Sequence, residues 1–570
     1  IMNRNIESHF SHLPKANIQR SIFDRSCSYK TSFNAGELIP FFVDEVLPGD
    51  TFDITTAKVV RSQTMLTPIF DNLYLDTFYF YVPSRLCWDH WKEFCGENTA
   101  GAWAPSVEYT IPSLASPEGG FSSGTLADYM GLPVGVEWSA DDPLSPSALP
   151  FRAYALICDH FFRDENLQDP LLIPRGDANQ QGTNDSGLSA PANGGRPFIA
   201  NRYHDYFSSA LPSPQKGDPV GIPISIPGFQ GGTFPVTTTA FDLESELPES
   251  AYPVLTYLDS SAGGFAEFTP DSINMLSRAS GSVASQPPAT ATNYPFSFAN
   301  LATVIPPQAD QETSELSFTI NQFRLAYVLQ SYLERLARGG SRYSELLLSL
   351  FGVKSPDARL QDPEYLGGNR IPLQVTEATN VAQTEQDFLG DVGAKSATSD
   401  VHSDFVKSFT EHGFVIGLFC CRFAHSYSQS LNRMWMRKKF EDFYNPMFAN
   451  LGEVPIYKAE IYATSDTIAD SSNIFGYQEI WADYRYKPNL VTGEMRPGVP
   501  NSLAFWHLAD YYSDEPVLSA EWIQEDKNLV DRVLAVSSSV SNQFWADVFI
   551  KNKCTRCMPM YSIPGLEPKL

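Results

Sequence analysis

Short apolar runs separated by turn residues mark the first part of the chain. Three of these runs, Leu38–Val43, Val59–Val60 and Leu73–Val82, are rich in β-branched and aromatic side chains, which favour strands. Pro48–Asp50 has the composition of a turn, and Leu66–Pro68 breaks the pattern again. Strands of about 8 to 12 residues between such turns are typical of an antiparallel sandwich or barrel.

The last third of the chain again contains short apolar segments that predict strands. Apolar, β-rich segments recur at Gly413–Tyr427, Gly476–Tyr486, Arg532–Val540 and Ser541–Lys551. Early strands would then pair with late ones, which is the arrangement that a jelly roll needs. Within Leu73–Val82 only Asp76 is strongly polar, so we expect both faces of that strand to be mostly covered.

Helical periodicity appears between these two regions. Phe323, Tyr327, Val328, Tyr332 and Leu336 recur at spacings of three and four between Asn321 and Gly339, which predicts an amphipathic helix. A second helix is predicted from Ser341 to Gly352, with a buried face formed by Tyr343, Leu346, Leu347 and Leu350. Shorter helical stripes occur at Arg85–Phe94 and Phe151–Phe162.

The segment from about Gly176 to Asn321 has a different composition, rich in Gly, Ser, Pro, Thr and Ala. Residues 203–321 carry twelve acidic and only two basic side chains, a net charge of −10. A loop of this length is improbable inside a compact domain, so we predict an inserted surface subdomain. Ile222–Ile226 and Ala251–Leu258 could supply its strands.

Composition and charge limit the classes of function. The 570 residues are 43% hydrophobic and 19% charged, as expected of a folded protein, with a formal net charge of −26. This charge argues against a protein that coats nucleic acid over most of its surface, so any such contact must be local. The sequence contains no run of about 20 apolar residues, and the N-terminus lacks the apolar core of a signal peptide. We therefore expect no membrane insertion.

Two local excesses of positive charge are candidates for contact with DNA. The first 32 residues lack a strand pattern and carry five basic side chains, Arg4, Lys15, Arg20, Arg25 and Lys30, against two acidic ones. The second cluster combines aromatic and sulfur side chains with Arg433, Arg437, Lys438 and Lys439. The first segment could equally be a solvated or subunit-bridging terminus. In the second, Met434, Trp435 and Met436 could simply be core residues.

No pattern in the sequence singles out a catalytic, metal or cofactor site. Cys554 and Cys557 have the C-x-x-C spacing of zinc or redox sites, but no second pair or histidine cluster accompanies them. Eight scattered cysteines are typical of reduced thiols in a protein made in the cytosol. A secreted β-sandwich glycoside hydrolase or a carbohydrate-binding module is the alternative class, but the abundant carboxylates do not identify a catalytic pair.

Three stretches carry a resemblance to a known family: FNAGELIPFFVDEVLPGDTF, DNLYLDTFYFYVPSRLCWDHWKEFCGE and ARGGSRYSELLLSLFGVKSPDARLQDPEYLGG. They resemble the major capsid protein of microviruses, small single-stranded DNA phages, in the gokushovirus branch. The resemblance runs, with an interruption, from about Ser26 to Tyr561. It implies a structural protein of the virion, assembled in the host bacterial cytoplasm, with no enzymatic activity and no cofactor.

The resemblance also implies a fold and a set of partners. The fold would be mainly β, an eight-stranded antiparallel jelly roll of the viral capsid type whose long loops carry helices and a surface protrusion. The partners would be other copies in a T=1 icosahedral shell, the packaged single-stranded DNA, a small basic DNA-binding virion protein and a host receptor. The corresponding division of the chain is a basic arm (1–32), a first part of the core (33–175), an insertion (176–320), a helical hairpin with its loop (321–400) and a second part of the core with a C-terminal arm (401–570).

Overall fold

The fold is that of a computed structural model, which describes residues 19–99, 101, 108–221, 255–259, 264–271, 274–280, 296–297, 319–379 and 392–561. The chain divides into two compact units. The first, the body, consists of Ile1–Pro219 and Leu329–Leu570, and the second is Val220–Val328. The insertion predicted from residue 176 therefore begins later, because side chains such as Ala200, Phe207 and Leu211 are buried in the body.

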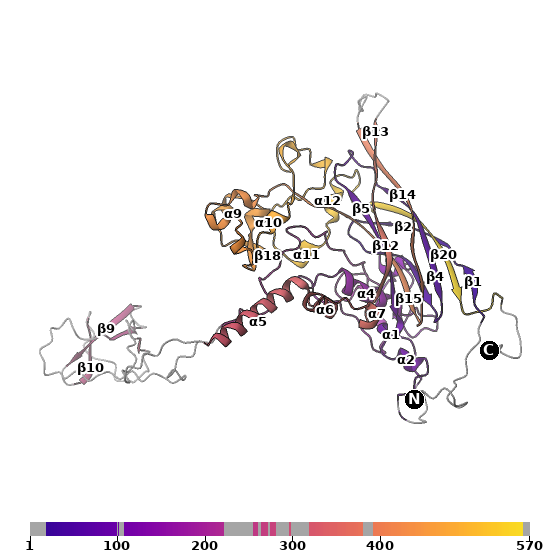
Figure 1. Ribbon diagram of the computed structural model, residues 1–570, viewed down its shortest axis with the longest axis horizontal. Coiled ribbons are helices and arrows are strands. Elements are labelled where there is room, and N and C mark those ends of the chain that lie inside the picture. The colour runs from indigo at the N-terminus through magenta and orange to yellow at the C-terminus, as the bar shows by residue number, and fades with distance from the viewer. Residues whose placement is uncertain are drawn as a thin grey trace. The chain divides into compact units, whose positions relative to one another are not determined.

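The larger sheet of the body joins both ends of the chain (Figure 1). Its strands are antiparallel, and β20 (Phe544–Arg556) pairs with β1 (Ser21–Asp24), β2 (Cys27–Phe33) and β4 (Thr51–Ser62). On the far side of β4 follow β14 (Val392–Ser408) and then β13 (Val375–Thr379). The side chains of β4 and β20 alternate between buried and more exposed positions, as expected of a sheet with one face on a core.

The second sheet has the order β12-β5-β15-β3, again antiparallel. It consists of β12 (Glu364–Pro372), β5 (Leu73–Pro83), β15 (Gly413–Phe423) and β3 (Ile39–Val46). The two sheets enclose the main hydrophobic core, in which Phe33, Phe52, Tyr79, Phe419 and Phe544 are buried. The mainly β architecture with antiparallel sheets, predicted from the short apolar runs, is confirmed.

The other face of the second sheet is covered by a layer of long connections, residues 84–219 and 424–543, which we call the loop layer. Phe80 and Ile416 of the sheet pack there against Trp88, Leu149 and Tyr154. The first connection contains α1 (Ser84–Cys87), α2 (Trp91–Phe94), α3 (Leu126–Tyr129), α4 (Leu149–Ile157) continued by a π-helical turn to Phe162, β6 (Leu114–Ala115) and β7 (Gln180–Gln181). A third core joins the two connections and includes Tyr206, Phe207, Tyr427, Ile456 and Trp522.

The remaining elements are short apart from one helix. The second connection contains β16 (Ser426–Tyr427), β17 (Glu453–Tyr457), α8 (Lys458–Ile461), α9 (Ser465–Ala469), β18 (Ile474–Glu479), α10 (Ala482–Arg485), β19 (Asn489–Leu490), α11 (Ala520–Ile523) and α12 (Lys527–Asp531). The hairpin consists of α5 (Ile320–Gly339) and α6 (Tyr343–Phe351), followed by α7 (Asp357–Leu360). The second unit contains the antiparallel sheet β10-β9-β8-β11, formed by Asn274–Ser280, Gly264–Asp271, Leu255–Asp259 and Phe296–Ser297.

Several local predictions need correction. Residues 21–33 form strands, although no strand pattern was expected before Phe33, because β20 supplies their partners from the far end of the chain. Arg532–Val540 is not a strand: after α12 it makes turns in which Ser538 hydrogen-bonds Asp531. Arg85–Phe94 is two single turns, because Trp88 is extended between α1 and α2. Ile222–Ile226 lies outside the described residues.

Both predicted helices form, as α5 and α6, but their apolar side chains are less buried than expected. Tyr343 is 67% exposed, and no residue of α6 is fully buried. On α5, Tyr327 is 70% and Val328 is 61% exposed, and Ala337 is the single residue of that helix that is buried. The amphipathic stripe thus lies on the surface of the subunit.

Candidate functional site

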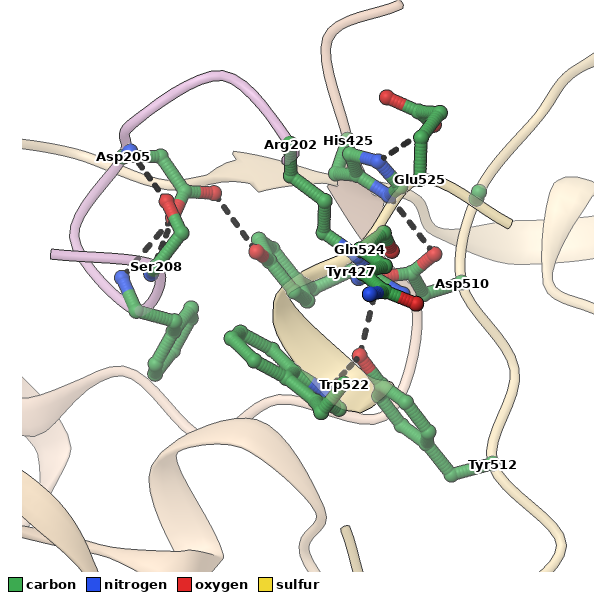
Figure 2. Close-up of polar contacts among 12 residues, drawn as sticks. Arg202, Asp205, Ser208, His425, Tyr427, Asp510, Tyr512, Trp522, Gln524 and Glu525 are labelled. Atoms are coloured by element: carbon green, nitrogen blue, oxygen red, sulfur yellow. Dashed lines mark hydrogen bonds and ion pairs between the residues drawn. The ribbon is translucent and has the colours of Figure 1, made fainter. Parts of the chain in front are cut away.

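A network of buried polar side chains lies in the loop layer around His425 (Figure 2). This side chain follows β15 and lies between two carboxylates that are far away in sequence. Its Nδ1 lies 2.9 Å from Asp510 Oδ1 and its Nε2 lies 3.1 Å from Glu525 Oε1. All three side chains are at least 96% buried. Both ring nitrogens are therefore occupied, which holds the imidazole in place.

The two carboxylates stabilise the charged form of this histidine. Burial opposes protonation, but the negative charges of Asp510 and Glu525 outweigh it and raise the pKa of His425 to about 9. Burial likewise opposes ionisation of Asp510, yet His425 and Arg202 hold the pKa of that carboxyl well below its usual range. At neutral pH the site contains a charged imidazolium against ionised Asp510.

Arg202 extends the network from the first connection to the second. Its guanidinium donates to Asp510 Oδ2 at 2.8 Å and to the carbonyl of Gln524 at 3.3 Å. The same group lies over the ring of Trp522, 4.9 Å from the centroid. Tyr512 Oη donates a further hydrogen bond to Asp510 Oδ2 at 2.9 Å. Asp510 thus accepts three charged or polar partners, which offsets the cost of burying it.

A second part of the network fixes the segment after Arg202. Asp205 accepts a hydrogen bond of 2.6 Å from Tyr427 Oη and bonds of 2.8 to 3.0 Å from Ser208 and the backbone of Phe207 (Figure 2). Tyr427 belongs to β16, so this aspartate connects the first connection to the strand that follows β15. Together the two parts tie residues 201–210, 425–427 and 510–525 into one unit.

The contacts of His425 indicate a structural role and not a catalytic one. A catalytic histidine needs a free nitrogen within reach of a nucleophile, whereas both nitrogens of His425 contact carboxylates. Within the described ranges, no three His, Cys, Asp or Glu side chains are arranged to hold a metal ion. What the network can do is hold two long connections together at a fixed angle.

Asp76 forms a similar junction beneath the loop layer. It is 2% exposed on β5 and accepts hydrogen bonds from Arg370 Nε at 2.6 Å and from Tyr203 Oη at 2.8 Å. Arg422 of β15 makes an ion pair with the same carboxylate. The guanidinium groups of Arg370 and Arg422 lie 4.2 and 4.4 Å from the ring centroid of Tyr203. One aspartate thus joins three strands to the first connection.

The structure places the basic candidates near the N-terminus partly within the larger sheet. Arg4 and Lys15 lie outside the described residues, and Arg20 lies just before β1. Arg25 pairs with Asp44 at 2.8 Å, and Lys30 pairs with Asp547 at 3.1 Å while its side chain stays 70% exposed. Of these three, Arg25 is the one engaged with a well-buried partner.

In the second basic cluster, the two arginines make contacts within the protein and the two lysines do not. Arg433 contacts Glu460 at 3.4 Å and donates to the carbonyl of Pro455 at 3.0 Å. Arg437 pairs with Asp483 and lies over the ring of Tyr484. Lys438 and Lys439 are exposed, and their side chains make no ion pair with any residue that the structure describes. The two arginines therefore stabilise the loop layer, and the two lysines face solvent.

The turns after Asn432 carry an apolar surface that the sequence pattern did not indicate as exposed. Trp435 is 71%, Phe440 70% and Met447 88% exposed, with Phe443, Tyr444 and Leu451 also above half. We call residues 434–451 the aromatic turn surface. Such a concentration of exposed apolar side chains marks an interaction site on a soluble protein.

The eight cysteines are free, and most of them are buried. Cys554 is buried on β20, and Cys557 is half-buried beside Gly49. Burial raises the pKa of the Cys87 thiol to about 12, so that thiol is un-ionised at neutral pH. Two arginines near the turn between α5 and α6, Arg338 and Arg342, pair with Glu453 and Glu165. In the part of the chain that the structure covers, no helix has the length and apolar character that a membrane crossing requires.

Comparison with known proteins gives one consistent answer. The family model described as capsid protein (F protein) matches residues 11–566. The chain is 37% identical to capsid protein VP1 of Chlamydia phage 1, over 99% of this chain and 98% of that protein. It is 36% identical to capsid protein VP1 of Spiroplasma virus 4 (98% and 96% covered) and to that of Bdellovibrio phage phiMH2K (99% and 98%).

These relatives are structural proteins, so the interpretation as a glycoside hydrolase is wrong and the protein is not an enzyme. The resemblance drawn from the three sequence stretches is confirmed over nearly the whole chain. The chain belongs to the phage capsid protein (F protein) family.

Proposed function

We propose that this capsid protein builds a closed T=1 icosahedral shell from a single type of subunit around a single-stranded DNA genome. The observation that carries the proposal is the apolar surface left uncovered on one subunit. The aromatic turn surface and the stripe on α5 expose Trp435, Met447 and Tyr327 by 70% or more. A subunit that repeats heterologous contacts around symmetry axes would cover such surfaces in every copy.

We further propose that the body is an eight-stranded jelly roll. The orders β2-β20-β4-β14 and β3-β15-β5-β12 support this, because each sheet interleaves strands from the two ends of the chain. Each of the long connections between β5 and β12 and between β15 and β20 then forms one loop of the jelly roll. β1 and β13 extend the larger sheet at its edges.

The second unit would serve host attachment on the outer surface of the shell. The second unit, Val220–Val328, carries ten acidic and two basic side chains, a net charge of −8, which DNA phosphates would repel within a Debye length of about 8 to 10 Å. An outward position avoids this repulsion and keeps particles apart in solution. The acidic subunit also makes a small basic virion protein useful as a partner, because that protein would neutralise DNA inside the shell.

Electron microscopy of the purified protein tests the assembly directly. We expect closed particles of one size that contain nuclease-protected DNA. Small soluble oligomers under all assembly conditions would refute the shell. Replacing Gly231–Ala284 by a short Gly-Ser link should leave assembly and packaging intact and reduce attachment to host cells. If the shortened subunit folds but does not assemble, the second unit is a contact between subunits.

The role of the N-terminal arm has its own test. Deleting residues 2–20 removes Arg4, Lys15 and Arg20 and ends before β1, so the body should still fold. We expect fewer particles or particles that lose their genome. A wild-type yield of full particles from the deletion would exclude an inward or bridging role for the arm.

A further inference from the structure

The larger sheet has one face that no other part of the described chain covers. Its inner face packs on the main core, whereas Trp545 and Phe549 of β20 are 44% and 48% exposed on the other side. Val401 and Val406 of β14 are 71% and 66% exposed on that same side. We call this surface the open sheet face. Because the loop layer covers the second sheet, the open sheet face and the loop layer lie on opposite sides of the body.

This layer order determines which side of the subunit would point inward. The segments that lead into and out of the second unit contact each other and the loop layer: Gln330 bonds Gln215, and Arg338 Nε donates to Glu453 at 3.1 Å. The chain leaves the body at Pro219, at the end of the first connection of the loop layer, so we take the loop layer as the outer side, in keeping with the proposed function. The open sheet face then lines the interior.

The pattern of side chains on the open sheet face suits a single strand of nucleic acid. Trp545 lies opposite Arg61 of β4, and Phe549 lies opposite Ala57 of β4 and Ser28 of β2. The two aromatic side chains are four residues apart, or roughly 13 Å along the strand. Phe549 has small residues on both sides, and Trp545 has Ser32 of β2 on one side and the long side chain of Arg61 on the other. Unpaired bases stack on exposed aromatic rings of this kind.

The charge of this face also differs from that of the whole chain. It carries five basic side chains, Lys30, Arg61, Lys395, Lys551 and Lys553, and three acidic ones, Asp24, Asp53 and Asp547, a net charge of +2 where the chain has −26. Lys30 pairs with Asp547. Arg61, Lys551 and Lys553 make no ion pair with any described residue, but Lys553 lies opposite Asp24 of β1 and Asp53 of β4. The charges of Arg61 and Lys551 are therefore the most available to phosphates, and the charge of Lys553 is available in part.

We propose that the open sheet face binds the packaged single-stranded DNA, with bases stacked on Trp545 and Phe549 and phosphates held by Arg61, Lys551 and Lys553. The contact is independent of sequence, because every base can stack and every nucleotide carries a phosphate. The proposal rests on the proposed enclosure of a single-stranded DNA genome, and it adds the surface that touches that genome.

Photochemical crosslinking of full particles tests the stacking. Irradiation with short-wave ultraviolet light followed by digestion and mass spectrometry should find nucleotide adducts on Trp545 or Phe549. The double variant Trp545→Thr/Phe549→Thr replaces both rings by a β-branched residue that favours strands, and it should lose these adducts. Tyr511→Thr, an exposed aromatic position of the loop layer outside the aromatic turn surface, is the matched control and should keep them. Full particles without adducts on β20 would overturn the proposal and leave the shell function intact.

Binding of oligothymidylate to dissociated subunits tests the phosphate contacts even if no particles form. For single strands, the slope of log affinity against log salt is about −0.7 per phosphate contact, so Lys551→Ser/Lys553→Ser should make it shallower by about 1.4. Lys487→Ser/Arg496→Ser removes the same charge from exposed positions of the loop layer and should leave the slope unchanged. Equal slopes for wild type and the Lys551/Lys553 variant would overturn the proposal and indicate that another protein covers this face.

Discussion

The buried imidazolium of His425 makes the stability of the loop layer depend on pH. We consider the substitution His425→Gln, which keeps a polar side chain of similar length but removes the positive charge between Asp510 and Glu525. In the folded protein the pKa of His425 is raised to about 9 from a usual value of 6.5. The charged form is therefore favoured by folding, and its stabilisation is fully present below pH 6.5 and lost as the pH rises through 9.

The size of this contribution follows from the pKa shift. Each pKa unit corresponds to about 1.4 kcal/mol, so the linkage relation gives roughly 3 kcal/mol at pH 6, about 2 kcal/mol at pH 7.5 and close to zero at pH 10. The side chain is 4% exposed, so solvent screens this interaction little. Because Arg202 remains beside Asp510 in the variant, we expect the loss to stay near the lower end of the ~3–5 kcal/mol found for broken buried pairs.

Urea unfolding of dissociated subunits, followed by far-ultraviolet circular dichroism, measures this directly. The wild type should be more stable than His425→Gln by about 3 kcal/mol at pH 6, and the two unfolding free energies should converge near pH 10. His204→Gln, at an exposed position, is the control and should follow the wild type at every pH. A constant difference between wild type and His425→Gln from pH 6 to pH 10 would refute the assignment of a buried imidazolium.

Three further variants test other parts of the structure. Asp76→Asn leaves two arginines without their shared carboxylate and should lower the unfolding free energy of the subunit by about 3–5 kcal/mol in urea. Tyr327→Ser/Val328→Ser alters exposed side chains of α5, so it should change the unfolding free energy by less than about 0.5 kcal/mol but reduce the yield of particles seen by electron microscopy. Gly368→Ala would place a Cβ 1.9 Å from the carbonyl oxygen of Thr77 on the paired strand, and thermal unfolding should show a loss on the order of 3 kcal/mol.

The strands were predictable where the local pattern was sufficient. Leu73–Val82 and Gly413–Phe423 are continuous apolar runs, and they are neighbours at the centre of the second sheet, covered on both faces. Residues 21–33 contain many serines and other polar side chains and no long apolar run, and their strands exist because β20 offers hydrogen-bond partners more than 500 residues away. The sequence pattern within residues 21–33 contains no information about such a distant partner.

The buried polar site shows the same limit. Arg202, His425, Asp510 and Glu525 follow one another along the chain at intervals of 15 to 223 residues, and none of them stands in a motif. Asp76 was different, because a single carboxylate in an otherwise apolar strand indicates either an exposed edge or a buried partner. In the structure Asp76 is buried, and its partners Arg370 and Arg422 belong to strands that pair with β5. Contacts of this kind depend on the sheet order, which the strand pattern alone does not determine.

The charge and the apolar surfaces of the subunit act against each other, and this has a consequence for assembly. Side chains such as Trp435, Phe440 and Met447 favour association, whereas a net charge of −26 opposes it. Added salt screens the repulsion between subunits and leaves apolar contacts largely unaffected. Binding of DNA to the open sheet face would weaken as salt rises, because each phosphate contact releases counterions. Shell closure and genome retention should therefore respond to salt in opposite directions, so empty shells should form at higher salt than filled ones.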